Sequence, residues 1–259
     1  MLQKIHNYDS LHFMYKIPPD YVDLIICDGP YGMSKAPWDK IDNIQQYNLA
    51  LLKNFKRILK PGGTVYLFGK YDSLDFIDYT KYLSLQRKIV WYLPASLSQG
   101  KKNYTNNYDV IYYLSKGEVK TFNLDEIRVD QNTDPKQRQA VEKVPSVKNG
   151  KYGKTKYNPK GKNPGDVWFD IKALTYRSAE LFANGLKTIQ KPEKLIERLI
   201  LASSNAGDIV FDPFIGTGTT ASVCEKLNRQ WFGCENDEKT FQLAMDRITF
   251  LQSQLPQEK

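Results

Sequence analysis

The sequence predicts an α/β domain in which a mostly parallel sheet carries helices on both faces. Short apolar stretches typical of buried strands alternate along the chain with stretches of helical periodicity. Two of these strands, residues 21–27 and 209–212, are apolar almost throughout and lead into an acid and a glycine-containing turn. Ligands bind at such strand ends in open parallel sheets, so the same pattern also predicts where a site lies.

The first part of the chain alternates strands with helices. Helical spacing of apolar residues predicts a helix over 44–59, which Lys60 to Gly63 ends. Asp9 is either a turn or cap residue or part of a site, and the sequence leaves both readings open. The predicted elements are strands at 4–6, 21–27, 64–68 and 88–93 and helices at 44–59 and 74–83.

The strand over 21–27 breaks at the sequence Asp28-Gly29-Pro30-Tyr31-Gly32. This places an acid, a turn and an aromatic ring at the carboxyl end of a central strand, the ligand-binding edge of such sheets. The alternative is an ordinary turn with an exposed tyrosine. We favour a site because the second strand ends in the same way at Asp212.

The chain changes character from residue 94. A polar, loop-like stretch over 96–104 precedes a predicted strand at 109–114, and a long irregular basic stretch follows. Between residues 147 and 163 there is no acid, and Tyr152 and Tyr157 lie among the lysines. Lysines neutralise phosphates and tyrosines stack on bases, although a solvated loop is the alternative. The lysines of this stretch are Lys148, Lys151, Lys154, Lys156, Lys160 and Lys162.

The last part of the chain contains the most informative stretch. A helix starts at Pro192 and has a buried apolar face, and a closing helix is predicted over 243–251. Between them lies a unit of five parts: a strand at 209–212, a loop with Gly216 and Gly218, a helix at 221–227, a strand at 230–234, and Glu235.

This unit predicts a site for a nucleoside-bearing cofactor. Glycine allows the backbone to approach a ligand, and the helix N-terminus adds free amides. An acid at the end of the next strand, here Glu235, is where a ribose diol is usually held. A turn without a ligand and a nicotinamide site both remain as alternatives, because residues 216–221 also fit the weak pattern G-x-G-x-x-A.

Composition points to an anionic partner. The chain has 259 residues, which favours one domain with an insertion, and a formal net charge of +8. Nucleic acid is the first candidate partner, and a bias for solubility is the alternative. The three cysteines show no metal-like spacing, and we see neither a membrane span nor a signal peptide. We therefore expect a cytoplasmic protein without a metal.

The order of these motifs resembles the β-class amino-methyltransferases of DNA, which use S-adenosylmethionine, and among them the MboII-type adenine methylases. That family has D/N/S-P-P-Y/F first, then a variable recognition region, then T-x-K-P and F-x-G-x-G. This chain has the corresponding segments in the same order: Asp28–Tyr31, the basic region, Ile189–Pro192 and Phe214–Gly218. The chain departs from the family at Gly29, where proline is usual, and before Lys191, where His-Pro is common.

The resemblance implies a Rossmann-like methyltransferase fold with a circularly permuted motif order. It divides the chain into a catalytic half at 1–93, a target-recognition and DNA-binding insertion at 94–186, and a cofactor-binding half at 187–259. The reaction expected is methyl transfer to adenine N6 of a base flipped out of duplex DNA, with cytosine N4 as the alternative target. A non-catalytic DNA-binding module and a nicotinamide-dependent dehydrogenase leave the catalytic motif unexplained.

The resemblance also implies roles for individual residues. Asp28 and a main-chain carbonyl at position 29 or 30 would accept the two N–H bonds of the target amine, and Tyr31 would stack on the base. Asp28, Pro30 and Tyr31 are thus the expected catalytic residues. The expected cofactor-binding residues are Asp9, Asp28, Thr188, Lys191, Phe211, Asp212, Phe214, Gly216, Gly218, Thr219 and Glu235. Those expected to bind DNA are Lys101, Lys102, Lys151, Lys154, Lys156 and Lys160.

Partners follow from the same resemblance. Duplex DNA is the expected substrate, while a second copy of the chain and a cognate restriction endonuclease are further candidates. Proline at position 29 is expected to be tolerated if φ there lies near about −65° and the amide is unbonded.

Overall fold

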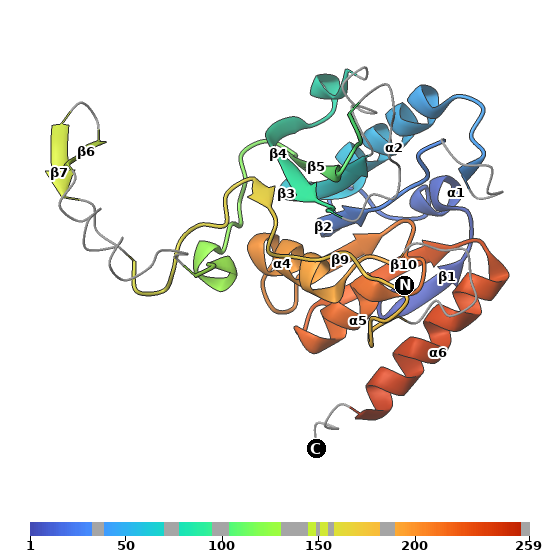
Figure 1. Cartoon of the computed structure of the whole chain (residues 1–259). Helices are drawn as coiled ribbons and strands as arrows, with labels where there is room; N and C mark the ends of the chain where they lie inside the picture. The colour runs from blue at the N-terminus through green and yellow to red at the C-terminus, as the bar shows by residue number, and fades with distance from the viewer. Residues whose placement is uncertain are drawn as a thin grey trace.

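A mixed eight-stranded sheet forms the centre of the computed structural model (Figure 1). The structure describes residues 1–32, 39–69, 78–94, 104–130, 145–148, 151–154, 158–181 and 190–254. In order across the sheet, the strands are β1 (Lys4–Asn7), β10 (Gln230–Glu235), β9 (Ile209–Asp212), β2 (Val22–Cys27), β3 (Leu59–Gly69), β5 (Tyr108–Ser115), β4 (Ser84–Tyr92) and β8 (Val167–Trp168).

The sheet is parallel from β1 to β3 and mixed beyond it. β5 runs antiparallel to both β3 and β4, and β8 pairs parallel to β4. The prediction of a mostly parallel sheet is therefore confirmed, and the half that carries both motifs is parallel throughout. The antiparallel strands are the part that the alternation of strands and helices did not indicate.

Helices cover both faces of the sheet, as predicted (Figure 1). The helices α1 (Ser10–Met14) and α2 (Ile44–Ile58) pack on one face. The helices α4 (Glu193–Ser203), α5 (Thr219–Lys226) and α6 (Glu238–Gln254) pack on the other.

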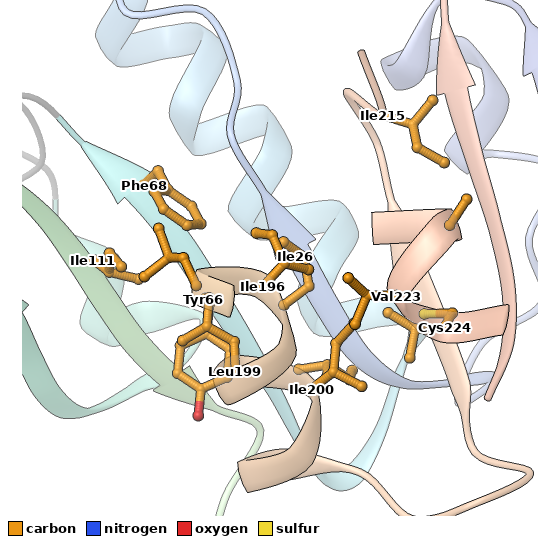
Figure 2. Close-up of a cluster of buried hydrophobic side chains, with 14 of the residues drawn as sticks. Ile26, Tyr66, Phe68, Ile111, Ile196, Leu199, Ile200, Ile215, Val223 and Cys224 are labelled. Carbon is orange, nitrogen blue, oxygen red and sulfur yellow. The ribbon is translucent and has the colours of Figure 1, made fainter. Parts of the chain in front are cut away.

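The strand β2 shows why its sequence is apolar almost throughout. Leu24 and Ile26 point into the core beneath α4 and α5, whereas Ile25 and Cys27 point into the core beneath α1 and α2. Side chains of a strand alternate between its two faces, so a strand covered on both sides needs apolar residues at every position. Figure 2 shows the first of these cores, in which Ile26 faces α4.

Several element boundaries differ from the predictions. The closing helix α6 begins at Glu238 rather than at 243, because the Asp237 carboxylate caps its first turn by accepting the Thr240 amide at 2.9 Å. Residues 61–63 belong to β3 instead of a separate loop. In the stretch predicted as a helix over 74–83, residues 74–77 lie outside the described part, and Tyr79–Lys81 forms a 3₁₀ turn.

The middle of the chain contributes to two sheets. The strands β5 and β8 belong to the main sheet. The strands β6 (Pro145–Lys148) and β7 (Lys151–Lys154) form a separate antiparallel ribbon, which Figure 1 shows apart from the main sheet. A short 3₁₀ turn, η3 (Leu124–Ile127), follows β5. Within the described residues, none of the helices is long and apolar enough to cross a bilayer.

Candidate active site

Both predicted motifs emerge at the same edge of the sheet. The strands β2 and β9 are adjacent and parallel, with Leu24 opposite Val210 and Ile25 opposite Phe211. The loops that follow them, starting at Asp28 and Asp212, therefore leave neighbouring strands at their carboxyl ends. Parallel neighbours at this edge are what a ligand-binding crevice requires.

Asp28 makes contacts with two other residues named from the sequence. The Tyr31 hydroxyl donates a hydrogen bond to Asp28 Oδ1. The ammonium of Lys191 lies 2.8 Å from Asp28 Oδ2. Burial, together with the nearby Asp28 carboxylate, raises the pKa of Tyr31 well above its usual value, so the phenol stays protonated and can donate this bond.

Lys191 occupies a position that the sequence did not indicate. Its side chain is 8% exposed, and its Nζ lies 5.3 Å from the ring centre of Phe68 and 6.0 Å from that of Tyr31. Aromatic faces and a carboxylate together stabilise a desolvated cation. Tyr31 and Lys191 each bind one oxygen of Asp28, and each carboxylate oxygen has a second lone pair with which it can accept an N–H from an amine.

A second buried carboxylate supports the same loop. Asp39 is 2% exposed, and its Oδ1 accepts the amides of Tyr31 at 2.6 Å and Gly32 at 2.8 Å. Sequence reasoning missed Asp39, because it lies outside the motif and no local periodicity marks it.

Gly29 packs against Phe214, in the loop that follows β9. Its φ lies outside the left-handed region, as proline there would require, but an added Cβ would lie 2.9 Å from Cε2 of the Phe214 ring. A proline ring at this position would therefore press on the Phe214 ring, so the expected tolerance of proline is not supported.

We expect Gly29→Pro to weaken cofactor binding clearly while the melting temperature changes little. The added ring must displace the half-buried Phe214 side chain, which is part of the predicted cofactor site. Calorimetric titration and thermal melts of Gly29→Pro, compared with Gly29→Ala, check this. Gly29→Ala keeps the amide but adds the same Cβ, so a wild-type affinity in both variants would contradict the expectation.

The glycine loop between β9 and α5 contains two residues with left-handed backbone. Gly216 has φ of 53° and Gly218 has φ of 80°. Among the described residues, a Cβ at Gly216 would meet only the Phe214 carbonyl oxygen, at 3.8 Å, whereas one at Gly218 would face Ala244 of α6 at 3.4 Å. Gly216 is therefore the glycine with open space beside it, and Gly218 is required chiefly by its backbone conformation.

Asp212 shapes this loop from inside. Its carboxylate accepts the Phe214 amide at 2.9 Å and the Thr220 hydroxyl at 2.5 Å. Burial raises the pKa of Asp212 to about 7, although both hydrogen bonds act in the opposite direction. The carboxyl group thus joins the strand end to the first turn of α5.

Glu235 ends the neighbouring strand, as predicted. β10 pairs with β9 in parallel, so Glu235 and Asp212 lie at the same edge of the sheet. Burial raises the pKa of Glu235, whose Oε1 accepts the Asp237 amide at 2.8 Å. A carboxylate at the end of this strand is correctly located to accept hydroxyl groups of a ribose.

A buried arginine on the closing helix, α6, donates hydrogen bonds to the glycine loop. Arg247 donates to the Thr217 carbonyl and the Thr219 hydroxyl, both at 3.1 Å, and to Glu193 Oε1 at 2.7 Å. Glu193 begins α4, two residues after Lys191. The arginine therefore links the glycine loop to the segment that carries Lys191. No sequence motif indicated this residue.

Asp9 acts as a helix cap in the structure. Its side chain accepts the His12 amide at 2.9 Å at the start of α1, and the imidazole of His12 lies 3.0 Å away. The Ser10 hydroxyl donates to the Pro213 carbonyl, which joins this turn to the glycine loop. The structural reading of Asp9 is thus confirmed, and its contact with a cofactor stays a prediction.

The predicted DNA-binding lysines are described only in part. Lys160 forms an ion pair of 2.6 Å with Asp125, so its charge is already partnered. Lys151 and Lys154 lie on β7. Lys101, Lys102 and Lys156, together with the predicted cofactor residue Thr188, fall outside the described residues. In the part of the chain that is described, no group of His, Cys, Asp or Glu could hold a metal ion.

The fold and the paired strand-end loops define a Rossmann-like methyltransferase. A family model described as "DNA methylase" matches residues 22–246, and the chain belongs to this family of N6 and N4 methylases. The loop that starts at Asp28 precedes the glycine loop in the chain although the two strands are neighbours, which is the permuted order expected.

Curated relatives match over nearly the full chain. Type II methyltransferase M1.MboII of Moraxella bovis is 32% identical over 246 residues, which is 90% of this chain and 92% of that protein. DNA adenine methyltransferase YhdJ of Escherichia coli K12 is 34% identical and covers 94% of this chain and 81% of its own length.

Solved structures of lower identity share the fold. The crystal structure of the M1.HpyAVI–SAM complex has a TM-score of 0.61 at 20% identity, covering 94% of this chain and 98% of that one. The cytosine-N4-specific PvuII DNA methyltransferase has a TM-score of 0.66 at 15% identity, covering 97% and 94%.

Proposed function

We propose that this chain transfers a methyl group from S-adenosylmethionine to N6 of an adenine flipped out of duplex DNA. The observation that carries the proposal is the position of Asp28, at the end of β2 and beside the glycine loop of β9. A carboxylate that can align an amine thus neighbours a loop that can hold a nucleoside-bearing cofactor. Membership of the DNA methylase family supports the same assignment.

The residues present fit S-adenosylmethionine. The open space at Gly216 allows backbone to approach a ligand, and Glu235 at the end of β10 can accept the ribose hydroxyls. The other expected cofactor residues of this region lie in the same loop or at its two ends: Phe211, Asp212, Phe214, Gly218 and Thr219. When bound, the cofactor supplies an electrophilic methyl sulfonium.

The loop that starts at Asp28 would make the target amine a better nucleophile. An exocyclic amine is a poor nucleophile because its lone pair is delocalised into the ring. Asp28 and the Pro30 carbonyl would each accept one N–H bond, which favours a tetrahedral nitrogen with its lone pair directed at the methyl group. The nitrogen would gain the methyl group as the bond between methyl and sulfur breaks, would become positively charged, and would then lose one proton, for which Asp28 is the proposed acceptor. Tyr31 would stack on the flipped base.

We propose adenine N6 as the target because position 28 is aspartate. The cytosine-N4 enzymes of the family that the chain resembles more often carry serine at this position. YhdJ, which is described as an adenine methyltransferase, supports this choice, while the PvuII enzyme shows that the fold also serves cytosine N4. Mass spectrometry of digested DNA, after incubation with the chain and S-adenosylmethionine, is expected to detect N6-methyladenine. Detection of N4-methylcytosine instead would overturn the adenine assignment, and absence of any methylated base would overturn the function.

The segment 94–186 is proposed to recognise DNA, with the catalytic half at 1–93 and the cofactor half at 187–259. Methylation-sensitive sequencing of DNA from cells that express the chain would define the recognition site. A DNA substrate also fits the cytoplasmic location we expect.

Two protein partners are also proposed. Several relatives are described as Type II methyltransferases, which supports a restriction endonuclease of the same specificity as a partner. A second copy of the chain is the other proposed partner.

We expect replacement of Lys151, Lys154, Lys156 and Lys160 by glutamine to weaken binding to all DNA sequences. The slope of log affinity against log salt should become shallower by about 0.9 for each phosphate that the protein no longer neutralises. Lys160 should contribute least, because Asp125 already neutralises it. Fluorescence anisotropy over a range of salt concentrations measures the slope. The control replaces four exposed lysines elsewhere, Lys53, Lys56, Lys81 and Lys239. Equal slopes in both variants would show that the basic stretch is merely solvated.

A further inference from the structure

The carboxylate of Asp39 is almost completely buried, yet the proposed reaction does not use it. Its exposed fraction is 2%, and a single oxygen, Oδ1, accepts the two consecutive amides of Tyr31 and Gly32. Burying a carboxylate is costly unless hydrogen bonds compensate for the lost water. A buried acid on the backbone of the catalytic loop therefore suggests a role in holding that loop.

Two consecutive amides of the loop, those of Tyr31 and Gly32, converge on this carboxylate. Consecutive amides that point toward a common centre form a concave site for an anion. Asp39 Oδ1 fills that centre, at 2.6 and 2.8 Å from the two nitrogen atoms.

Anchoring the Tyr31 amide also fixes the carbonyl of the preceding residue. The peptide between Pro30 and Tyr31 is planar and trans, since none of the described residues has a cis bond. In a trans peptide the C=O and N–H bonds point in opposite directions. With the Tyr31 N–H held on Asp39, the Pro30 carbonyl must point to the other side of the loop, away from Asp39.

We propose that Asp39 is a positioning residue, which aims the Pro30 carbonyl at the target amine and holds the Tyr31 ring over the base. This rests on the proposed function, in which that carbonyl accepts one N–H of the amine. The Tyr31 hydroxyl already reaches Asp28, so the same anchor sets the relative position of both acceptors of the amine. The proposal assigns Asp39 itself no contact with substrate or cofactor.

Three substitutions separate position from charge. Asp39→Ala removes the acceptor, and Asp39→Glu keeps the charge but displaces it by one methylene group. We expect both to slow single-turnover methyl transfer by about tenfold to a hundredfold, the effect of a small misalignment of reacting groups. Asp39→Asn should stay within about threefold of the wild type, because its amide oxygen still accepts both bonds. Asp42→Ala, which removes an exposed acid three residues further on, is the matched control and should react normally.

Two other measurements distinguish alignment from general damage. The affinity for S-adenosylmethionine should remain unchanged in all variants. Fluorescence of 2-aminopurine at the target position should show that a flipped base is held less firmly by Asp39→Ala and Asp39→Glu. A wild-type rate in Asp39→Glu, or an equal loss in Asp39→Asn and Asp39→Glu, would overturn the proposal. Because Asp39→Glu keeps a buried carboxylate, the test does not depend on Asp39→Ala folding.

Amide hydrogen exchange tests whether Asp39 anchors the loop, independently of whether the protein methylates DNA. In the free protein, the amides of Tyr31 and Gly32 should exchange faster in Asp39→Glu than in Asp39→Asn. If the wild type does not methylate DNA but exchange follows this order, the anchor is supported and only the proposed reaction fails. If exchange at these two amides is the same in the wild type and both variants, the anchor itself is wrong.

Discussion

Asp28→Ala is expected to abolish methyl transfer while binding of S-adenosylmethionine survives. The substitution removes the acceptor for one N–H of the amine and the proposed acceptor of its proton. The glycine loop at Gly216 would remain, since it belongs to the neighbouring strand. A loss of at least about a hundredfold in rate is expected, in line with removal of a positioned general base. Transfer of a labelled methyl group to DNA and calorimetric titration of the cofactor measure the two effects.

The structure adds a complication to this experiment. Asp28→Ala leaves the buried ammonium of Lys191 without the partner that lies 2.8 Å away, and an unpaired buried charge destabilises a fold. The matched control is Asp28→Ala combined with Lys191→Met, which removes both charges and keeps the apolar stem. Asp28→Asn tests the charge alone. Near-normal turnover in any of these folded variants would contradict the role of Asp28.

Gly218→Val is expected to abolish cofactor binding. The residue has φ of 80°, which costs about 1–2 kcal/mol for a residue with a Cβ and more for a β-branched one. The side chain would also press on Ala244 of α6, which an added Cβ already approaches to 3.4 Å. Both effects distort the start of α5, where the amides of the cofactor loop must be held. The expected cause is thus distortion of the loop and not a direct clash with the ligand.

Gly117 provides a matched control for this backbone strain. Its φ is also 80°, and no atom of the described residues lies within 4 Å of an added Cβ. It follows β5, at the end of the sheet opposite to the carboxyl ends of the parallel strands. Gly117→Val should lose similar stability in thermal melts yet bind S-adenosylmethionine normally. Unchanged cofactor affinity in Gly218→Val, measured by calorimetry, would refute the role of this loop.

Much of the cofactor side of the site could be predicted because its parts are consecutive in the chain. The strand β9, the glycine loop, α5, β10 and Glu235 follow one another, and each has a local signal. Apolar runs mark strands covered on both faces, and glycine marks the turn between strand and helix. Such signals depend on neighbouring residues alone, so they survive without knowledge of the fold.

The catalytic side was predictable only as a motif. The sequence identified Asp28 and Tyr31, but their hydrogen bond and the contact with Lys191 depend on how distant segments pack. Lys191 was expected at the cofactor, and that role stays a prediction. The chain alone gives no measure of which strand lies beside the start of α4, so it did not show that the Lys191 ammonium pairs with Asp28.

By itself, the sequence determined the alternation of strands and helices, the two acid-ended strands and the resemblance to a family. Only the tertiary structure decided that β2 and β9 are neighbours, that β5 and β4 run antiparallel, and that Asp39 and Arg247 hold the two loops. The physical reason is that periodicity reports which face of an element is buried. Strand order and buried polar contacts are set instead by the packing of segments far apart in the chain, which leaves no local pattern.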